Sequence, residues 1–245
     1  MTMDQALKGK GAIVTGAAGG IGGAIARAFA AAGAQVACLD QKKFPETKNC
    51  LAIECDVSSE SETKKAVEQA AKAFGGLHVL VHAAAANDPS GSVTDLDLGA
   101  WNQVFAVNVG AAFLMSRWVV PHMARAGGGS IIHIASQLGS VGSPGRVVYC
   151  ATKGALINMV RAMAADHAAQ NIRVNTLSPG AVETERMPRR FGSMEKARAA
   201  LGPKHLLNRL AQPSEIAAAA LFLASDASSF MTGSDLRVDG GYNAV

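Results

Sequence analysis

The sequence predicts an α/β protein with a doubly wound, parallel, seven-stranded sheet that is covered by helices on both faces. Seven short runs are too continuously apolar for strands that have one face in water. Between most of them lie longer segments with apolar residues at helical spacing, which stop at glycine. The 245 residues, 49% of them hydrophobic, suffice for one large domain over 1–245, and no repeat or flexible linker divides them.

The elements alternate along the chain in the order that right-handed strand–helix–strand crossovers require. The expected strands span 11–16, 34–40, 50–57, 77–83, 130–136, 172–179 and 235–241. The expected helices span 22–33, 61–76, 101–127, 147–168 and 214–226. Ser214, after Pro213, is the expected N-cap of the last helix. The segment between Asp40 and Asp56 leaves room for little more than one turn of helix before the third strand.

Composition excludes several classes of function. The net charge of +4 comes without a dense basic tract, so we expect no nucleic-acid partner. Four cysteines form no paired CxxC pattern, and six histidines lack ligand spacing, so we expect reduced thiols and no metal. Neither a long apolar span nor a signal-like leader is present, which predicts a soluble, cytoplasmic protein without a membrane partner.

A glycine-rich turn follows the first strand and opens the first helix. Gly16, Gly20 and Gly22 form G-x-x-x-G-x-G, which permits a tight turn and a close approach of backbone N–H groups to a pyrophosphate. Close packing of a helix on a strand also selects glycine and alanine. Here, however, the glycines lie between the first strand and the start of a helix, which is where dinucleotide binding needs them. The sequence therefore predicts a Rossmann-type fold.

Asp40 ends the second strand, about twenty residues beyond this turn. A carboxylate there accepts hydrogen bonds from the adenosine ribose and repels a 2′-phosphate. Lys42 and Lys43 follow closely and weaken that repulsion. We expect NAD as cofactor, with NADP less favoured.

Three polar residues farther along the chain could together transfer a proton to or from an alcohol. Ser136 closes the fifth strand, at the sheet edge where ligands bind in such folds. Tyr149 and Lys153 lie one turn apart on the expected helix 147–168, so the ammonium favours the phenolate form of a base that is otherwise too weak at neutral pH. A Tyr-x-x-x-Lys pair alone is weak evidence of a site; the glycine turn, Asp40 and Ser136 supply its context.

Over nearly its entire length the chain resembles the short-chain dehydrogenase/reductase family. "TGAAGGIG" resembles the cofactor turn, "SPGAVETERM" the motif after the sixth strand, and "MTGSDLRVDGG" the C-terminal signature. The resemblance implies that Asn108, Ser136, Tyr149 and Lys153 are catalytic, with Asn108 holding a relay water. It implies cofactor contacts from Gly16, Gly20, Ile21, Gly22, Asp40, Asp56, Val57, Ala83, Tyr149, Lys153, Pro179, Gly180, Val182 and Thr184.

One segment departs from the family pattern. Where many members have Asn-Asn-Ala-Gly after the fourth strand, this chain has "HAAA", His82 to Ala85. His82 is either a core histidine, which we favour, or a replacement for the missing amide hydrogen bonds. Ala85 leaves room for the cofactor if its φ is negative.

The substrate-binding candidates are Ser136, Gln137, Arg146 and Arg186. Arg146 lies nearly one turn before Tyr149 and is either a surface arginine or a clamp on a substrate anion. Residues 184–210 resemble the family's substrate lid, in which Arg186, Arg189 or Arg190 supplies a second contact.

We therefore expect an NAD-dependent oxidoreductase that acts on a small polar or anionic hydroxy compound such as a hydroxy acid or sugar acid. The alternatives are a reductase for a 3-oxoacyl thioester or neutral ketone, and a non-catalytic dinucleotide-binding sensor. The resemblance also implies a homotetramer or homodimer.

Overall fold

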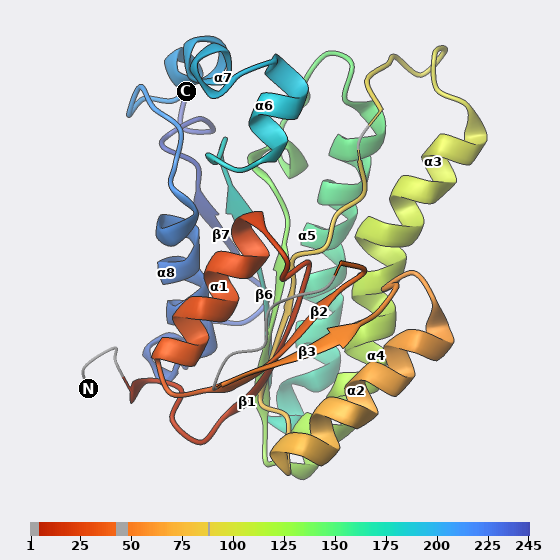
Figure 1. The fold of residues 1–245 in the computed structure, drawn as a ribbon, viewed down its shortest axis with the longest axis vertical. Helices are drawn as coiled ribbons and strands as arrows, with labels where there is room; N and C mark the ends of the chain where they lie inside the picture. Colours follow the sequence, from red (N-terminus) through yellow and green to blue (C-terminus); the bar gives the residue numbers. More distant parts are fainter. Residues whose placement is uncertain (1–4, 43–48, 88) are drawn as a thin grey trace.

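The computed structural model describes residues 5–42, 49–87 and 89–245. Its seven strands form one parallel sheet in the order β3-β2-β1-β4-β5-β6-β7 (Figure 1). The strands are β1 (Gly11–Thr15), β2 (Gln35–Asp40), β3 (Cys50–Glu54), β4 (Val79–His82), β5 (Gly129–Ile134), β6 (Ile172–Pro179) and β7 (Asp235–Val238). This confirms the predicted Rossmann fold. The strand order reverses between β1 and β4, and ligands bind at the carboxyl ends of the strands at such a point.

Helices cover both faces of the sheet (Figure 1). On one face lie α1 (Gly20–Ala31) and α8 (Pro213–Ala224), and on the other lie α2 (Glu60–Phe74), α4 (Ala111–Arg125) and α5 (Val147–His167). A π-helical turn, Ala106–Gly110, joins α4 to α3 (Leu98–Phe105). Two short helices, α6 (Arg186–Phe191) and α7 (Met194–Leu201), lie beyond the carboxyl ends of the strands. Single 3-10 turns span Gln137–Gly139, Ala168–Gln170, Gly202–Lys204 and Asp226–Ser228.

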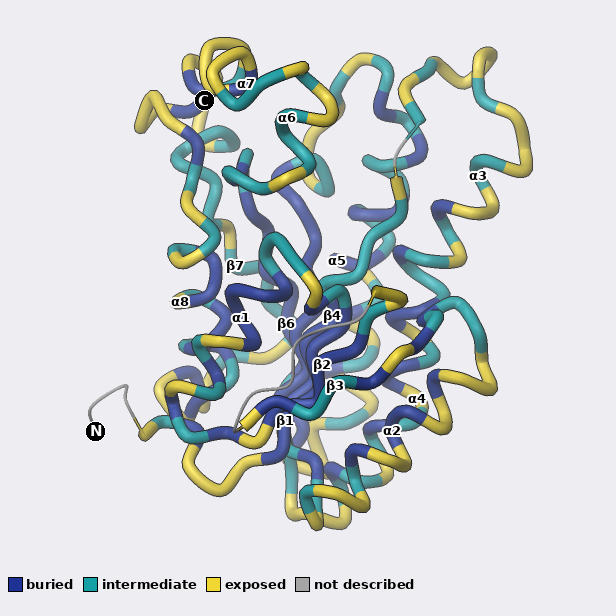
Figure 2. The backbone as a smooth tube through the Cα atoms, in the orientation of Figure 1, coloured by how far each residue is buried: buried dark blue, intermediate teal, exposed yellow. Residues whose placement is uncertain are grey.

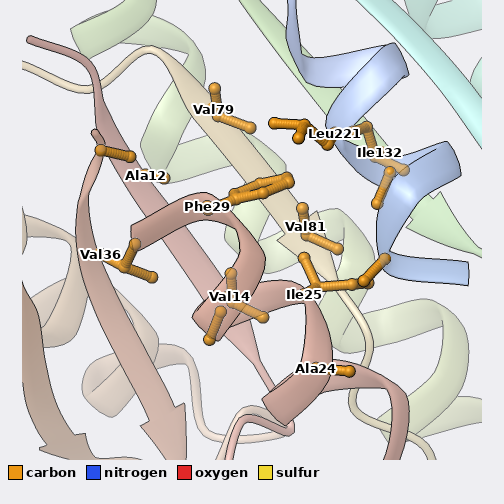
Figure 3. Packing of buried hydrophobic residues seen from close by; sticks show 14 of the residues in the cluster. Ala12, Val14, Ala24, Ile25, Phe29, Val36, Val79, Val81, Ile132 and Leu221 are labelled. Atoms are coloured by element: carbon orange, nitrogen blue, oxygen red, sulfur yellow. The ribbon is translucent and has the colours of Figure 1, made fainter. Parts of the chain in front are cut away.

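The central strands, such as β1 and β4, are buried on both faces, as their continuous apolar sequence predicts, whereas the edge strands β3 and β7 are partly exposed (Figure 2). Successive residues alternate between two clusters because side chains of a strand point to opposite faces. Val14 belongs to one cluster with Phe29 of α1 and Leu221 of α8 (Figure 3). Its neighbour Ile13 belongs to the other cluster, with Met115 of α4. The two clusters fix the sheet and thereby the loops at its carboxyl edge.

Four of the five expected helices begin one to three residues earlier than predicted, and the caps of two of them show why. The helix that follows β4 begins at Leu98, three residues before the expected start at 101. The Asp97 carboxylate caps it there by accepting from the Ala100 N–H at 2.9 Å. The expected N-cap Ser214 is wrong: α8 begins at Pro213. Gln212 is its N-cap, and its N–H donates to Glu215 Oε2 at 2.7 Å. The expected turn between β2 and β3 falls largely on 43–48, outside the described residues, as does Lys43.

The continuous helix from Leu98 to Arg125 is long and apolar enough to cross a membrane by length and composition. Its α4 part, however, places Met115, Val119 and Met123 in the second core cluster, fully buried against the sheet. Burial against the sheet therefore accounts for part of its apolar composition.

Candidate active site

The carboxyl edge of the sheet is hollowed by two neighbouring cavities. One, of about 380 Å³, lies between the end of β5, the start of α5 and α6. The other, of about 550 Å³, lies over the turn between β1 and α1. Ile21, Ala83 and Thr184 line both cavities, so together they form one elongated cleft.

The glycine turn has the geometry of a phosphate cradle. Gly16 has φ +67° and Gly20 has φ +54°, which are left-handed conformations that glycine adopts without strain. A Cβ on Gly22 would collide with the carbonyl oxygen of Gly16. Helix α1 starts at Gly20 with no side-chain cap and no acidic residue in its first turn. These residues therefore fit the pyrophosphate of a dinucleotide, whose charge the open helix N-terminus favours.

Asp40 borders the same cavity at the end of β2. Its Oδ2 accepts from the Ala18 N–H at 3.1 Å and its Oδ1 accepts from the Lys42 N–H at 3.0 Å. The two bonds fix the carboxylate beside the glycine turn. Lys42 also lines this cavity.

Thr15 and His82 explain how the HAAA segment is held. The Thr15 hydroxyl oxygen accepts from the N–H groups of Ala83 and Ala84, each at 3.1 Å. Its own proton is thus available to His82 Nδ1, which lies 3.1 Å away. His82 is buried, and burial together with His133 and Lys153 holds its pKa well below the usual value. It is a neutral core histidine, as favoured above.

The backbone at Ala85 has the negative φ that leaves room for a cofactor. Among the described residues other than glycine, only Asn171 and Asn208 have positive φ, so φ at Ala85 is negative. Ala85 lines both cavities, and its small side chain leaves the cleft open beside the glycine turn.

Asn108 lies in the π-helical turn Ala106–Gly110 and is fully buried. Its Oδ1 accepts from the Ala86 N–H at 2.9 Å, and its Nδ2 donates to Thr152 Oγ1 at 3.0 Å. Thr152 in turn donates to the carbonyl of Tyr149 at 2.9 Å. The amide thus ties the segment after β4 to the helix that carries Tyr149 and Lys153. Such π-turns recur at functional sites.

Ser136, Tyr149 and Lys153 meet at the smaller cavity and all three line it. The Ser136 hydroxyl oxygen accepts from the Leu138 N–H at 3.2 Å. Lys153 Nζ donates to the carbonyl of Ile134 at 2.7 Å and lies 5.6 Å from the centre of the Tyr149 ring. Burial, with a smaller contribution from Arg186, lowers the pKa of Lys153 to about 7. The Lys153 amine, which lies beside the Tyr149 phenol, can therefore lose its proton near neutral pH.

Arg146 is 8% exposed and occupies the N-cap position of α5. Its guanidinium carbon lies 4.6 Å from the centre of the Tyr149 ring, closer than the ammonium of Lys153. Its backbone forms a bridge with Gly91, which fixes the entry to the helix. Arg146 is therefore not a surface arginine. It lies over the face of the Tyr149 ring and lines the cavity.

The chain after β6 lines the cleft from Thr184 to Arg190, and α7 follows it. Arg198 of α7 binds Glu183 through two hydrogen bonds of 2.7 Å, which lower the pKa of that carboxyl to about 2. Arg186 Nη2 donates to the carbonyl of Ala86 at 2.8 Å, across the cleft from α6. The Glu185 carboxylate approaches the glycine turn, where a Cβ on Gly19 would lie 3.0 Å from its Oε1.

Comparison with known proteins places this geometry in a family. The family model described as enoyl-(acyl carrier protein) reductase matches residues 16–243. Cis-4-hydroxycyclohexanecarboxylate dehydrogenase of Sinomonas cyclohexanicum is 37% identical over 99% of this chain and 100% of its own. D-threitol dehydrogenase of Mycolicibacterium smegmatis is 38% identical over 98% of this chain and 95% of its own.

The chain belongs to the short-chain dehydrogenase/reductase family. Its structure superimposes on the ligand-free aldohexose dehydrogenase of Thermoplasma acidophilum with a TM-score of 0.92, at 32% identity over 98% of this chain and 96% of that one. As a short-chain dehydrogenase it is an alcohol oxidoreductase that uses a nicotinamide dinucleotide, and members of the family are usually oligomeric.

Most of the residues that the sequence selects lie around the cleft of this short-chain dehydrogenase, and a few do not. Those that line it are Gly16, Gly20, Ile21, Gly22, Asp40, Ala83, Ser136, Arg146, Tyr149, Lys153, Pro179, Gly180, Val182, Thr184, Arg186, Arg189 and Arg190. Asp56, Val57, Asn108 and Gln137 do not line either cavity. The Gln137 amide is buried behind the cavity wall, where a Cβ on Gly180 would lie 2.9 Å from its Oε1.

Sequence reasoning missed Thr15, Thr152 and Glu185. A polar residue at the end of the apolar run GAIVT was the available signal for Thr15, because a buried hydroxyl needs partners. Thr152 precedes Lys153, but its contact with Asn108 depends on how two helices pack. Nothing local marks Glu185, whose importance comes from the fold bringing α6 over the glycine turn.

Proposed function

We propose that this protein oxidises a small hydroxy compound that carries a carboxylate, with NAD as the hydride acceptor. The observation that carries the proposal is the charge of the cavity beside Tyr149. Four arginines and Lys153 line it, and no acidic side chain among the described residues does. The arginines are Arg146, Arg186, Arg189 and Arg190.

The four arginines divide by position. Arg186 and Arg189 also line the larger cavity over the glycine turn, where they face the phosphates of a dinucleotide. Arg146 and Arg190 line only the cavity beside Tyr149. These two are therefore the proposed contacts for a substrate carboxylate, because a guanidinium binds both oxygens of that group.

The chemistry follows from Ser136, Tyr149 and Lys153. Ser136 holds the substrate oxygen, and Tyr149 as phenolate takes the hydroxyl proton. NAD, when bound, supplies the acceptor for the hydride from the same carbon. The products are a ketone, NADH and neutral Tyr149, which returns its proton to solvent. Lys153 balances the charge of the phenolate, and the buried Asn108 keeps α5 in place.

The choice of NAD rests on Asp40. Its carboxylate is fixed beside the glycine turn by the Ala18 and Lys42 N–H groups. It accepts hydrogen bonds from ribose hydroxyls but repels a 2′-phosphate.

A relative supports the substrate class, and others favour a second candidate. The name of the Sinomonas relative describes a ring alcohol with a carboxylate, which combines the two groups that this cavity would bind. The D-threitol and aldohexose dehydrogenases are named for neutral substrates. Oxidation of a neutral polyol is therefore the second candidate, ahead of the reduction of an oxoacyl thioester and of a sensor without turnover.

The test compares cis-4-hydroxycyclohexanecarboxylate with its carboxamide, at constant ionic strength and saturating NAD. We expect kcat/KM for the acid to exceed that for the amide by about 10- to 100-fold, the value of one charged hydrogen-bonding pair. Arg190→Gln should reduce this ratio, while Lys72→Gln, which removes an exposed charge on α2, should not. Equal turnover of acid and amide would exclude the clamp and favour the neutral polyol.

We propose the cytoplasm as location, and a homodimer or homotetramer as the assembly. Phe113 on α4 is 51% exposed and β7 is one of the two edge strands of the sheet, which leaves an apolar side chain and a strand edge for subunit contacts. Light scattering of the purified protein tests the subunit number.

A further inference from the structure

The guanidinium of Arg146 lies over the face of the Tyr149 ring, with its central carbon 4.6 Å from the ring centre. Both residues line the cavity, and Arg146 is 8% exposed, so little solvent screens the contact. A cation over an aromatic face is attracted by the π electrons, most strongly where the pair is desolvated. A phenolate has more negative charge in its ring than a phenol. The contact therefore stabilises the ionised form more than the neutral form.

We propose that Arg146 is a positioning residue for proton transfer: stacked on Tyr149, it holds the ring in the cavity and favours the phenolate, so that oxidation proceeds at lower pH than Lys153 alone would allow. This role deepens the proposed function and rests on Tyr149 as the base. It differs from the carboxylate clamp, because it applies equally to a neutral substrate.

Among the described residues that line the cavity, Lys153, Arg186, Arg189 and Arg190 also carry positive charge. Arg146 lies nearer to the centre of the Tyr149 ring than Lys153 does. Lys153, on the same helix, loses part of its charge near neutral pH because burial lowers its pKa to about 7. Arg186 of α6 bonds to the Ala86 carbonyl instead. His82 and His133, behind Lys153 in β4 and β5, are buried, and burial keeps their pKa values low, so they remain neutral. Arginine stays protonated over the whole working range of pH.

Backbone hydrogen bonds at the start of α5 hold the two residues whose side chains stack, Arg146 and Tyr149. Arg146 N donates to the Ser143 carbonyl at 3.2 Å, and its own carbonyl accepts from Cys150 N at 2.9 Å. The carbonyl of Tyr149 is held by Thr152. The two side chains thus start from the first turn of one rigid helix, which fixes their relative positions.

A spectroscopic titration tests the proposal without turnover. The chain has two tyrosines, Tyr149 and Tyr242, so the variant Tyr242→Phe isolates the ultraviolet tyrosinate signal of Tyr149. In this background we expect Arg146→Gln to move the appearance of tyrosinate to higher pH by about one unit. Arg146→Lys, which keeps the charge but loses the planar stack, should lie in between. A midpoint unchanged in Arg146→Gln would overturn the proposal.

Kinetics with the neutral carboxamide separate this role from the clamp. The acid limb of the kcat profile should move upward with the tyrosinate midpoint in Arg146→Gln. A reduced preference for acid over amide with both pH midpoints unchanged would leave Arg146 as a clamp only, refuting the inference but not the proposed function. Shifted midpoints with an unchanged preference would support the inference and remove Arg146 from the clamp. If Arg146→Gln does not fold, Arg146→Lys in the same titration decides: a midpoint equal to that of the parent would overturn the stacking role.

Discussion

Asp40 offers a direct test of how the cleft selects its cofactor. Replacing it with asparagine keeps the size of the side chain and one acceptor oxygen, which can accept from one of the two N–H groups of Ala18 and Lys42. The substitution removes the negative charge that would meet the 2′-phosphate of NADP. Two unit charges about 4 Å apart interact by about 1 kcal/mol in bulk water and by about 4 kcal/mol near a protein surface. Because Asp40 is half-buried, the change should lie between these limits.

The expected result is a change of at least about tenfold in the ratio of kcat/KM for NADP to that for NAD, since tenfold corresponds to about 1.4 kcal/mol. Part of the change should come from weaker NAD use, because asparagine accepts the ribose hydrogen bonds less strongly. The assay follows NADH or NADPH formation with one alcohol at several salt concentrations. Lys42→Gln is the matched control and should move the ratio in the opposite direction. A ratio within about twofold of the wild-type value in Asp40→Asn would refute the electrostatic argument.

Four further predictions follow from other contacts. Glu185→Gln should tighten NADH binding by about three- to tenfold, because its carboxylate approaches the glycine turn that receives the pyrophosphate; fluorescence titration measures this, and equal or weaker binding would contradict it. Gly22→Ala should abolish the thermal stabilisation by NAD, because the added Cβ collides with Gly16; an unchanged shift would show that the turn relaxes. Phe29→Ala should lower the free energy of unfolding by about 3 to 5 kcal/mol in urea, and a loss below about 1 kcal/mol would mean that the core refills the space. Lys153→Met should be more stable than the wild type, most of all below pH 7. Burial lowers the Lys153 pKa from 10.5 to about 7, so unfolding takes up a proton between these pH values and the stability of the wild type rises across that window. A stability difference between variant and wild type that does not vary with pH would show that this lysine is not desolvated.

The fold was predictable because its physical cause is local in the sequence. Strands such as β1 and β4 are apolar up to their last residue and buried at every position, which only a sheet covered on both faces accommodates. The glycine turn was predictable for a similar reason, since its backbone conformations and the crowding at Gly22 exclude other residues. Tyr149 and Lys153 were predictable as a pair because helical spacing alone puts them on one face.

The remaining features depend on tertiary contacts that spacing does not encode. The π-turn around Asn108 accompanies bonds to Ala86 and Thr152, which come from different elements. The stacking of Arg146 depends on the direction that a long side chain takes at a helix N-cap, for which several rotamers are available. Gln137 immediately follows Ser136, yet the 3-10 turn that begins there directs its amide behind the cavity wall.

The central claim is that the cavity beside Tyr149 recognises an anion. Inhibition by cyclohexanecarboxylate, which has no hydroxyl group to oxidise, tests it most directly against cyclohexanecarboxamide, with a neutral alcohol as the substrate and ionic strength held constant. We expect the carboxylate to compete with the alcohol and to have an inhibition constant at least about tenfold lower than that of the amide. Equal inhibition by the two compounds, or none by the carboxylate, would contradict it.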